Sequence, residues 1–365
     1  MLLNRALILA TGLALCAAAS AQSNIAELIE QTGIEEGDVP MREMPGWRKP
    51  QKIVMPNVGL SQEELETLLP GVEVVTYRSR ADAIANAKGA DAIVGSCYRD
   101  LINAAEDAIW VQVFSAGVDR CVGAERIASG SIVLTNMQKM SSPVIAEHVI
   151  ALAFSLARGI PEFAKKMAGG GWYRGSDIAD RMMSVAGKTM LVIGLGGIGT
   201  EVARRAAALD MRVTGTRRSS REGPDFVDYV GLSDERFKLA AEADFIVNAL
   251  PLTAATTGLL DADFFEAAKP GAIFINVGRG RTVVTDDLVA ALESGQLAGA
   301  GLDVTDPEPL PPDHPLWQMD NVIITPHVSA RDSNRMRHMI LLKENLKRFA
   351  AGDALMNVVD PEFGY

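Results

Sequence analysis

Short apolar runs alternate along this chain with stretches in which apolar residues recur every three or four positions. In the first half, five runs have the length and the β-branched content of strands, at residues 53–55, 72–77, 92–94, 110–114 and 132–134. Helical patterns fall between them, and Ser61-Gln-Glu-Glu64 is a capping box that opens one helix. Strands that alternate with helices predict an α/β domain with a parallel sheet.

A second set of runs follows a long apolar helix pattern at residues 143–158, whose broad apolar surface predicts burial between two domains. Further strands are expected at residues 191–193, 211–216, 245–249, 272–277, 299–304 and 321–325. The tail from Arg331 has the pattern of a charged helix, and we expect it to pack back on the first domain. The sequence contains no internal repeat and no low-complexity tract.

Composition narrows the range of functions. A chain of 365 residues is long enough for two domains, and a hydrophobic content of 48% is ample for buried cores. The formal net charge of −11 argues against a nucleic-acid groove. After the first 21 residues, we find no stretch that is long and apolar enough to span a membrane.

The N-terminus is typical of a Sec-type signal peptide over residues 1–21. A short basic start is followed by small apolar residues, and Ala19-Ser20-Ala21 fits a cleavage site before Gln22. Cys16 lies in a poor lipoprotein box, because Leu15 rather than a small residue precedes it. If the signal is cleaved, we expect a periplasmic or secreted protein, and otherwise a cytoplasmic one.

Two cysteines, Cys97 and Cys121, are left after the expected cleavage. They permit one disulfide but do not require it. Residues 22–50 are polar and rich in proline, so we interpret them as a loosely ordered lead-in segment.

The most informative motif is Gly194-Leu-Gly196-Gly-Ile-Gly199, which follows an apolar strand and opens a helix pattern. A strand–turn–helix unit of this kind binds the pyrophosphate of a dinucleotide. Gly194 allows the tight turn, Gly196 lets the backbone approach the phosphates, and Gly199 lets the helix lie close to the strand. We therefore assign the whole turn to cofactor binding, with Gly197 and Ile198 at the start of the helix.

The end of the next strand bears on the choice of cofactor. NAD sites usually carry an acid there to bind the ribose 2′-hydroxyl, whereas this chain reads Arg217-Arg218-Ser219-Ser220-Arg221. Guanidinium groups bind a 2′-phosphate through charge-assisted hydrogen bonds. Arg217, Arg218 and Ser219 therefore favour NADP(H) over NAD(H), with a basic surface loop as the alternative interpretation.

Soluble nicotinamide cofactors are cytoplasmic, so a dinucleotide site conflicts with a signal peptide. There is no twin-arginine pair to export a prefolded enzyme with its cofactor. The sequence leaves open how an exported protein would obtain the cofactor.

Five motifs occur in a specific order from about residue 52 to 348, and together they resemble the D-isomer-specific 2-hydroxyacid dehydrogenase family. The motifs are the glycine turn, Ala249-Leu-Pro-Leu-Thr253, Ile275-Asn-Val-Gly-Arg-Gly280, Gly301-Leu-Asp-Val304 with Glu308, and Thr325-Pro-His327. The resemblance implies an α/β fold with two Rossmann-like or flavodoxin-like domains, parallel sheets, and a cofactor cleft between them. It divides the chain into a substrate domain at 51–150, completed by a C-terminal helix at 331–365, and an NAD(P)-binding domain at 151–330.

The family's catalytic roles carry over to three residues. Arg279, after the fourth strand of the second domain, resembles the arginine that binds the substrate carboxylate and polarises the carbonyl. His327 resembles the proton donor, because imidazole can supply a proton near neutral pH. Glu308 resembles the carboxylate that orients this histidine. We expect structural roles for His148, His314 and His338.

The resemblance also implies the binding residues. Asp303 corresponds to the residue that faces the nicotinamide carboxamide, and the backbone of Ser115, Ala116 and Gly117 to the loop that holds the substrate carboxylate. Tyr98 and Arg99 either read the substituent at C3 of the substrate or belong to ordinary surface. The remaining cofactor contacts are expected at Leu250, Pro251, Val277 and Gly278.

The sequence departs from the family in three places. Arg217 replaces the usual acid, residues 136–142 lack the commoner Pro-Gly form of their loop, and a signal peptide is not a usual family feature. The predicted activity is hydride transfer from NADPH to a small 2-oxo acid such as glyoxylate or hydroxypyruvate, giving a D-2-hydroxy acid, by a homodimer. The alternatives are an NAD-linked member that oxidises a hydroxy acid, or a non-catalytic NAD(P)-binding sensor or scaffold on the same fold.

Overall fold

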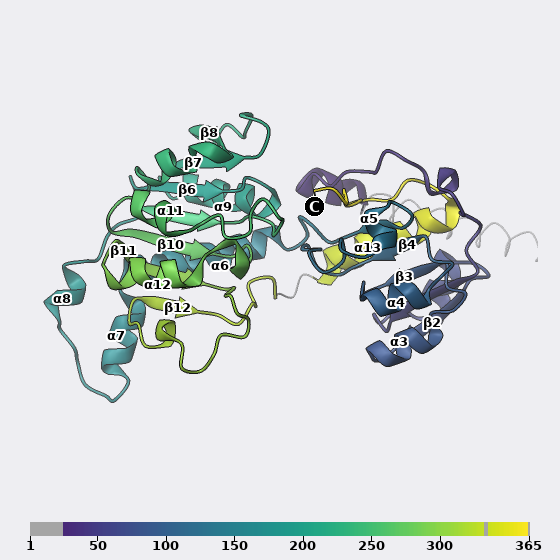
Figure 1. Ribbon diagram of the computed structural model, residues 1–365, viewed down its shortest axis with the longest axis horizontal. Coiled ribbons are helices and arrows are strands. Elements are labelled where there is room, and N and C mark those ends of the chain that lie inside the picture. The colour runs from purple at the N-terminus through teal and green to yellow at the C-terminus, as the bar shows by residue number, and fades with distance from the viewer. Residues whose placement is uncertain (1–24, 332–334, 364–365) are drawn as a thin grey trace, which may run out of the picture. The chain divides into compact units, whose positions relative to one another are not determined.

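The computed structural model describes residues 25–331 and 335–363, so the expected signal peptide at 1–21 lies outside the described residues. The chain divides into two compact units (Figure 1). The described part of unit 1 comprises residues 25–140 and 335–363, and that of unit 2 comprises residues 141–331. The division falls after Met140, ten residues before the expected boundary at 150.

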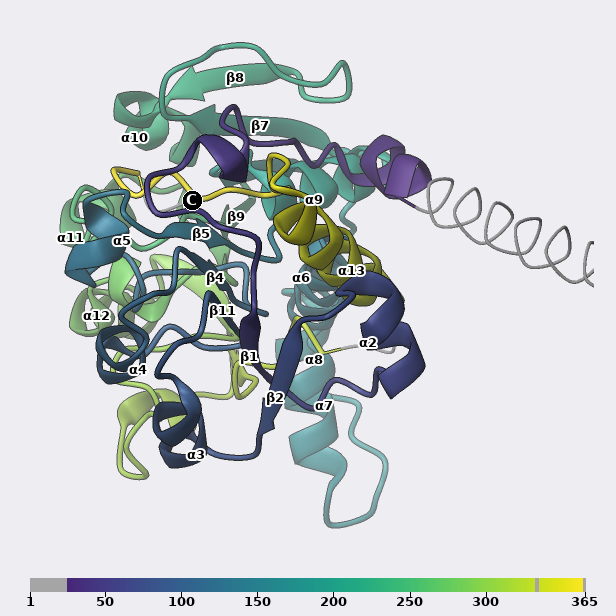
Figure 2. The same cartoon turned by 90° about the vertical axis from the view of Figure 1, so that its right-hand side faces the viewer.

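Unit 1 contains a five-stranded parallel sheet in the order β2-β1-β3-β4-β5 (Figure 2). This is the flavodoxin-like order, in which successive strands are added first to one side of β1 and then, from β3 onward, to the other side. Its strands are β1 Lys52–Pro56, β2 Glu73–Tyr77, β3 Ala92–Val94, β4 Trp110–Gln112 and β5 Val133–Thr135. Its helices are α2 Gln62–Leu68, α3 Arg80–Asn86, α4 Arg99–Ala104, α5 Glu125–Ala128 and α13 Arg335–Ala351. The predicted capping box at Ser61 and Glu64 is formed at the start of α2.

The lead-in segment is not loosely ordered from Ile25 onward, contrary to our expectation. Residues 25–32 are helical, and a short 3-10 helix, η1, covers Met41–Glu43. Their apolar side chains are buried in one cluster with the α13 residues Leu346 and Phe349. The tail helix therefore completes unit 1, and the lead-in joins it because their apolar side chains share one buried cluster.

Unit 2 contains a seven-stranded parallel sheet in the order β12-β11-β10-β9-β6-β7-β8. This is the Rossmann order extended by one strand, with the reversal between β6 and β9. Its strands are β6 Thr189–Ile193, β7 Arg212–Arg217, β8 Tyr229–Leu232, β9 Phe245–Asn248, β10 Ala272–Asn276, β11 Leu297–Leu302 and β12 Val322–Ile324. Its main helices are α9 Gly197–Ala207, α10 Arg236–Ala240, α11 Ala262–Ala267 and α12 Thr285–Glu293, with short 3-10 helices η2 Ser233–Glu235, η3 Gly280–Thr282 and η4 Pro315–Trp317.

The sequence pattern missed β8, so Arg279 follows the fifth strand of this unit and not the fourth. β8 is a four-residue edge strand that pairs with β7 alone. Such a strand has a weak apolar signal because it is short and pairs on one side only.

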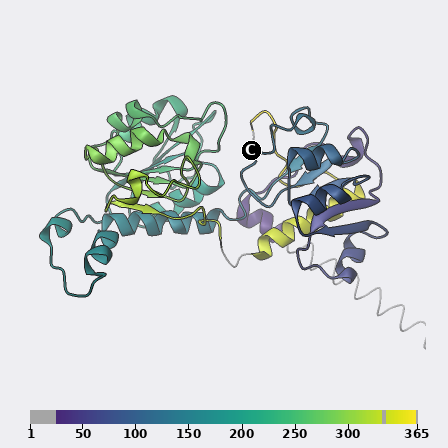
Figure 3. The ribbon, with the colours of Figure 1, turned by 60° about the horizontal axis from the view of Figure 1, so that its bottom comes forward.

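The long apolar helix is α6, Ser142–Ala157, which packs on the sheet of unit 2 (Figure 3). After Gly159 the chain turns away into α7, Ile160–Met167, and then α8, Ser176–Ala179. We call residues 159–182 the arm. Within the described residues, no single helix has the length and apolar character of a membrane span. Among the described helices, only α6 and α7 taken together, as a pair bent by 64°, have that length and apolar character.

Candidate functional site

The glycine turn lies between β6 and α9, at the reversal point of the seven-stranded sheet, where dinucleotides bind. Gly194 has φ of +95°, a backbone conformation that favours glycine. A Cβ on Gly199 would lie 2.0 Å from the carbonyl oxygen of Gly194, so only glycine lets α9 approach the turn. Around Gly196 there is no atom within 4 Å of a Cβ position, so the backbone is open to a ligand at this point.

The basic run begins at the last residue of β7, next to β6 in the sheet. The Arg217 guanidinium is partly buried, and its Nε has no hydrogen-bond partner within the described chain. Arg221, in contrast, pairs with Glu235 at 2.6 Å and with the Tyr229 hydroxyl at 2.9 Å. Arg217 and Arg221 are therefore not equivalent, because the Arg221 guanidinium is engaged by Glu235 and Tyr229.

These residues fit a dinucleotide. The open backbone at Gly196, the N-terminus of α9 and the Arg217 guanidinium at the end of β7 supply what a pyrophosphate and a 2′-phosphate require. Leu250 and Pro251 follow β9, and Val277 and Gly278 follow β10, at the same edge of the sheet. A Cβ on Gly278 would lie 2.7 Å from the Leu250 carbonyl oxygen, so the two turns are in contact.

A buried polar network holds the turn that carries Arg279. Asn276, the last residue of β10, accepts hydrogen bonds from Gly278 N at 3.1 Å and from Asn248 Nδ2 at 3.0 Å. The Thr282 hydroxyl donates to the Arg279 carbonyl oxygen at 2.7 Å. A fully satisfied buried network specifies one backbone geometry, so the turn is rigid. The half-buried Arg279 side chain projects from this rigid turn.

His327 and Glu308 form the expected pair. The distance between His327 Nδ1 and Glu308 Oε1 is 2.7 Å, and their side chains are 44% and 43% exposed. A carboxylate at Nδ1 fixes the tautomer and leaves Nε2 directed elsewhere to hold or release a proton. The exposure keeps both groups accessible to a ligand.

Asp303 supports the turn that carries His327. Its side chain is fully enclosed, and its carboxylate accepts hydrogen bonds from Thr325 Oγ1 at 2.7 Å, Val328 N at 2.9 Å and Ser329 N at 3.0 Å. The enclosed carboxylate thus fixes the turn around His327. Burial alone would raise the pKa of Asp303, but the hydrogen bonds from Ser329 and its neighbours outweigh burial and lower it.

The turn at His327 needs this support because His327 adopts φ of +52°, an uncommon conformation for a residue with a Cβ. Its backbone N–H donates to the Asp303 carbonyl oxygen at 2.8 Å. His148 Nε2 lies 3.0 Å from Thr325 Oγ1, so this histidine has the structural role we expected. His314 likewise caps η4 through Nδ1.

The candidate substrate residues of unit 1 lie in the loops that follow β3 and β4. Ser115 and Ala116 are exposed, and their carbonyl oxygens accept hydrogen bonds from Met137 N at 3.0 Å and Asn136 Nδ2 at 2.8 Å. The unusual loop at 136–142 therefore supports this backbone directly. Tyr98 and Arg99 stand at the start of α4 and are both exposed.

Sequence reasoning missed the buried network of Asn248, Asn276 and Thr282 and the supporting role of Asp303. A signal for the first exists in the sequence. An asparagine ends each of the otherwise apolar strands Phe-Ile-Val-Asn and Ala-Ile-Phe-Ile-Asn. A buried amide at a strand end requires hydrogen-bond partners and so predicts a network.

The parallel sheet of unit 2 with a glycine turn at its reversal point defines a dinucleotide-binding domain. Residues 150–329 match the family described as D-isomer specific 2-hydroxyacid dehydrogenase, NAD binding domain. The chain belongs to the D-isomer specific 2-hydroxyacid dehydrogenase family, whose members are NAD(P)-dependent oxidoreductases acting on CH–OH groups, and it is an enzyme of this class.

Three similar proteins support this assignment. Glyoxylate reductase/hydroxypyruvate reductase of Mus musculus is 36% identical over 250 residues, 67% of this chain and 75% of that protein. Glyoxylate/hydroxypyruvate reductase B of Salmonella heidelberg is 33% identical over 301 residues, 81% of this chain and 91% of that protein. The structure of an NADPH-dependent glyoxylate/hydroxypyruvate reductase from Sinorhizobium meliloti, in complex with NADP and sulfate, aligns with a TM-score of 0.72 at 28% identity and covers 86% of this chain and 100% of that one.

Proposed function

We propose that the protein reduces a small 2-oxo acid, such as glyoxylate or hydroxypyruvate, to a D-2-hydroxy acid with NADPH. The observation that carries the proposal is the convergence of Arg279 and the His327–Glu308 pair on one sheet edge with the glycine turn. The names of the mouse and Salmonella relatives support the choice of substrates. The Arg217 guanidinium at the end of β7 and the NADP-bound structural neighbour support the choice of NADPH.

The residues divide the chemistry among them. NADPH, when bound, supplies the hydride for the carbonyl carbon. Arg279 binds the substrate carboxylate with its planar fork of donors and polarises the carbonyl. His327 gives a proton from Nε2 to the carbonyl oxygen, and Glu308 stabilises the imidazolium that holds this proton. One proton and one hydride are consumed for each hydroxy acid formed.

The test is loss of NADPH absorbance with a panel of 2-oxo acids, for the wild type, Arg279→Ala and Arg281→Ala. Arg279→Ala should lower kcat/KM by about 10²–10³-fold and leave NADPH binding unchanged. Arg281 is exposed and two residues further on, so Arg281→Ala is the matched control and should retain activity. Unchanged turnover in Arg279→Ala would refute the assignment of the site.

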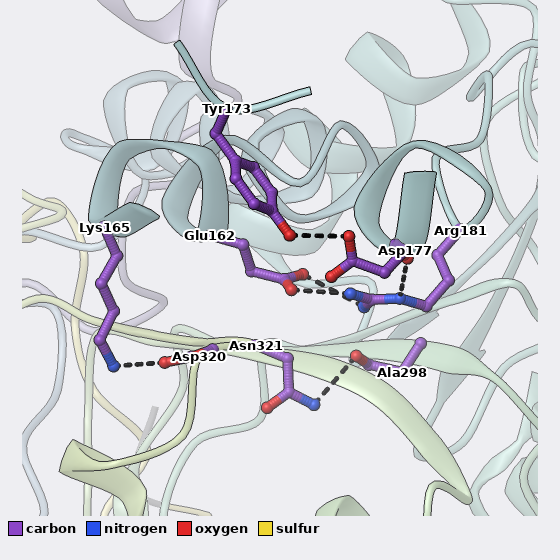
Figure 4. Close-up of polar contacts among 8 residues, drawn as sticks. All are labelled: Glu162, Lys165, Tyr173, Asp177, Arg181, Ala298, Asp320 and Asn321. Atoms are coloured by element: carbon purple, nitrogen blue, oxygen red, sulfur yellow. Dashed lines mark hydrogen bonds and ion pairs between the residues drawn. The ribbon is translucent and has the colours of Figure 1, made fainter. Parts of the chain in front are cut away.

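We also propose a homodimer formed through unit 2, in which the arm contacts the second copy. The arm exposes Ile160, Met167 and Trp172, with 82% of Trp172 accessible. Polar contacts stiffen it, because Arg181 bridges the Glu162 carboxylate at 2.7 Å and the Asp177 carbonyl oxygen at 2.9 Å (Figure 4).

Lys165 adds an ion pair with Asp320, which ties the arm to the loop before β12 (Figure 4). A rigid projection with exposed apolar side chains is typical of a protein–protein contact. Sedimentation should give twice the chain mass for the wild type and a lower mass for Trp172→Glu. Val39→Glu removes another exposed apolar residue and should not change the mass. A monomeric wild type would refute the proposal.

We propose further that the chain is exported after cleavage before Gln22. The disulfide between Cys97 and Cys121 supports this location, because disulfides persist in oxidising compartments and are rare in the cytosol. N-terminal sequencing of protein taken from the periplasm or medium should begin at Gln22. Recovery of the intact N-terminus in the cytoplasm alone would refute export.

A further inference from the structure

The two cysteines of unit 1 join loops at the edge of the sheet where its substrate residues lie. β3 and β4 are parallel neighbours, so the loops at their carboxyl ends run side by side. Cys97 lies in the first loop and Cys121 in the second, and they form a disulfide with their Cα atoms 5.3 Å apart. The bridge therefore connects two loops that are 24 residues apart in the sequence.

One end of the bridge is anchored and the other end is not. Cys121 is 3% exposed, donates its N–H to the Val118 carbonyl oxygen at 2.7 Å and accepts from Ala124 N at 3.0 Å. It thus belongs to the packed turn that follows Ser115–Gly117. Cys97 is only partly buried, and the residues that follow it, Tyr98 and Arg99, are exposed.

The backbone before Cys97 is held at Gly95, where the loop leaves β3. Gly95 adopts φ of +97°, which favours glycine, and its N–H donates to the Gln112 carbonyl oxygen at 2.6 Å. The bridge at Cys97, two residues later, holds the next part of the loop.

The other contacts of the Tyr98 and Arg99 side chains are weaker. The Arg80 guanidinium lies 4.4 Å from the centre of the Tyr98 ring and pairs with Asp100, but these groups are exposed to solvent. Exposed ion pairs contribute little to holding a conformation. Arg99 donates to the Gly123 carbonyl oxygen at 3.4 Å, which is long for a hydrogen bond.

We propose that the Cys97–Cys121 disulfide is a positioning element of the substrate site, which holds Tyr98 and Arg99 in register with the Ser115–Gly117 backbone. The inference rests on the proposed function, because that function makes these loops the substrate-contacting part of unit 1. Reduction by an external dithiol transfers two electrons and two protons to the bridge. It yields the two cysteine thiols and the oxidised dithiol. The freed loop then binds the 2-oxo acid more weakly, whereas cofactor binding by unit 2 is unaffected.

The experiment compares the oxidised protein, the protein treated with dithiothreitol, and the Cys97→Ser/Cys121→Ser double variant. Reduction should raise KM for glyoxylate or hydroxypyruvate about tenfold, because small displacements of a substrate loop have large kinetic effects. The affinity for NADPH, measured by fluorescence, should stay within about twofold. The double variant should have the raised KM without reductant and should not respond to dithiothreitol.

Two controls separate positioning from loss of folded protein. Partial unfolding would lower kcat through the active fraction and leave KM unchanged, whereas displacement of the loop raises KM. Reoxidation should restore the original KM. The double variant is not essential, because reduction of the wild type tests the same bond.

The outcomes distinguish the two proposals. An unchanged KM after reduction, with both thiols confirmed by mass spectrometry, overturns the role of the bridge and leaves the proposed function intact. Absence of turnover with any 2-oxo acid in both redox states, despite NADPH binding, overturns the proposed function and this inference with it.

Discussion

Replacement of Arg217 by aspartate should reverse the cofactor preference of the enzyme. Arg217 ends β7, where the adenosine ribose of a dinucleotide lies in this fold, and its side chain is only partly buried there. A hydrogen bond to a charged group contributes about 1.5–3 kcal/mol. Every 1.4 kcal/mol is a factor of ten, so loss of one such bond lowers kcat/KM for NADPH by about 10- to 150-fold.

The variants divide this effect into its parts. Arg217→Ala removes the bond, and Arg217→Asp adds repulsion of the 2′-phosphate and an acceptor for the 2′-hydroxyl of NADH. Arg221→Ala is the matched control from the same basic run, because the Arg221 guanidinium is already engaged by Glu235 and Tyr229. We expect it to change kcat/KM for NADPH less than about threefold, since exposed ion pairs are weak.

The assay is initial-rate loss of absorbance with NADPH and with NADH at a fixed concentration of 2-oxo acid. An unchanged ratio of the two kcat/KM values in Arg217→Asp would refute the reasoning. An equal effect of Arg221→Ala would refute it too, because the effect would then come from the charge of the run as a whole.

Three further predictions follow from the geometry of unit 2. Glu308→Gln should lower kcat by about 10²-fold and leave NADPH affinity unchanged, because it removes the charge that stabilises the His327 imidazolium; equal kcat values would exclude this role. Gly199→Ala should lower both thermal stability and NADPH affinity, because its Cβ would meet the Gly194 carbonyl oxygen. Gly196→Ala should lower the NADPH affinity alone, because a Cβ there meets no atom of the protein. Calorimetry measures the stability of each variant, and titration with NADPH measures its affinity. The pKa of Asp303 is lowered in the folded protein, so its ionised carboxylate stabilises the fold at pH values above the ordinary carboxyl pKa near 4. This stabilisation is lost as the pH falls towards the lowered pKa. Asp303→Asn should therefore show a smaller drop in Tm between pH 5 and pH 3 than the wild type.

The local patterns of the sequence were sufficient for the core of both units. The predicted strands of both sheets form within two residues of their expected ends, because apolar runs bounded by turn residues report burial directly. The glycine turn was predicted residue by residue, since the conformation at Gly194 and the close approach at Gly199 leave no other residue type. The pairing of His327 with Glu308 came from the family resemblance, and the 2.7 Å contact confirms it.

Features that depend on neighbours distant in the chain were not predicted. The edge strand β8 and the order in the lead-in arise from contacts with β7 and α13, which no local period records. The enclosure of Asp303 likewise depends on the turn at 325–329 closing over it, so its place in a motif did not reveal which atoms it contacts.

The sequence by itself determined the main elements and the dinucleotide turn, because these are set by residue type and spacing along one strand or turn. Only the tertiary structure decided whether Cys97 and Cys121 meet. Their separation of 24 residues permits many arrangements, and the pairing follows because β3 and β4 are neighbours in the sheet. The order of strands in a sheet arises from pairing between segments distant in the sequence, so contacts such as Cys97–Cys121 are set only when the chain has folded.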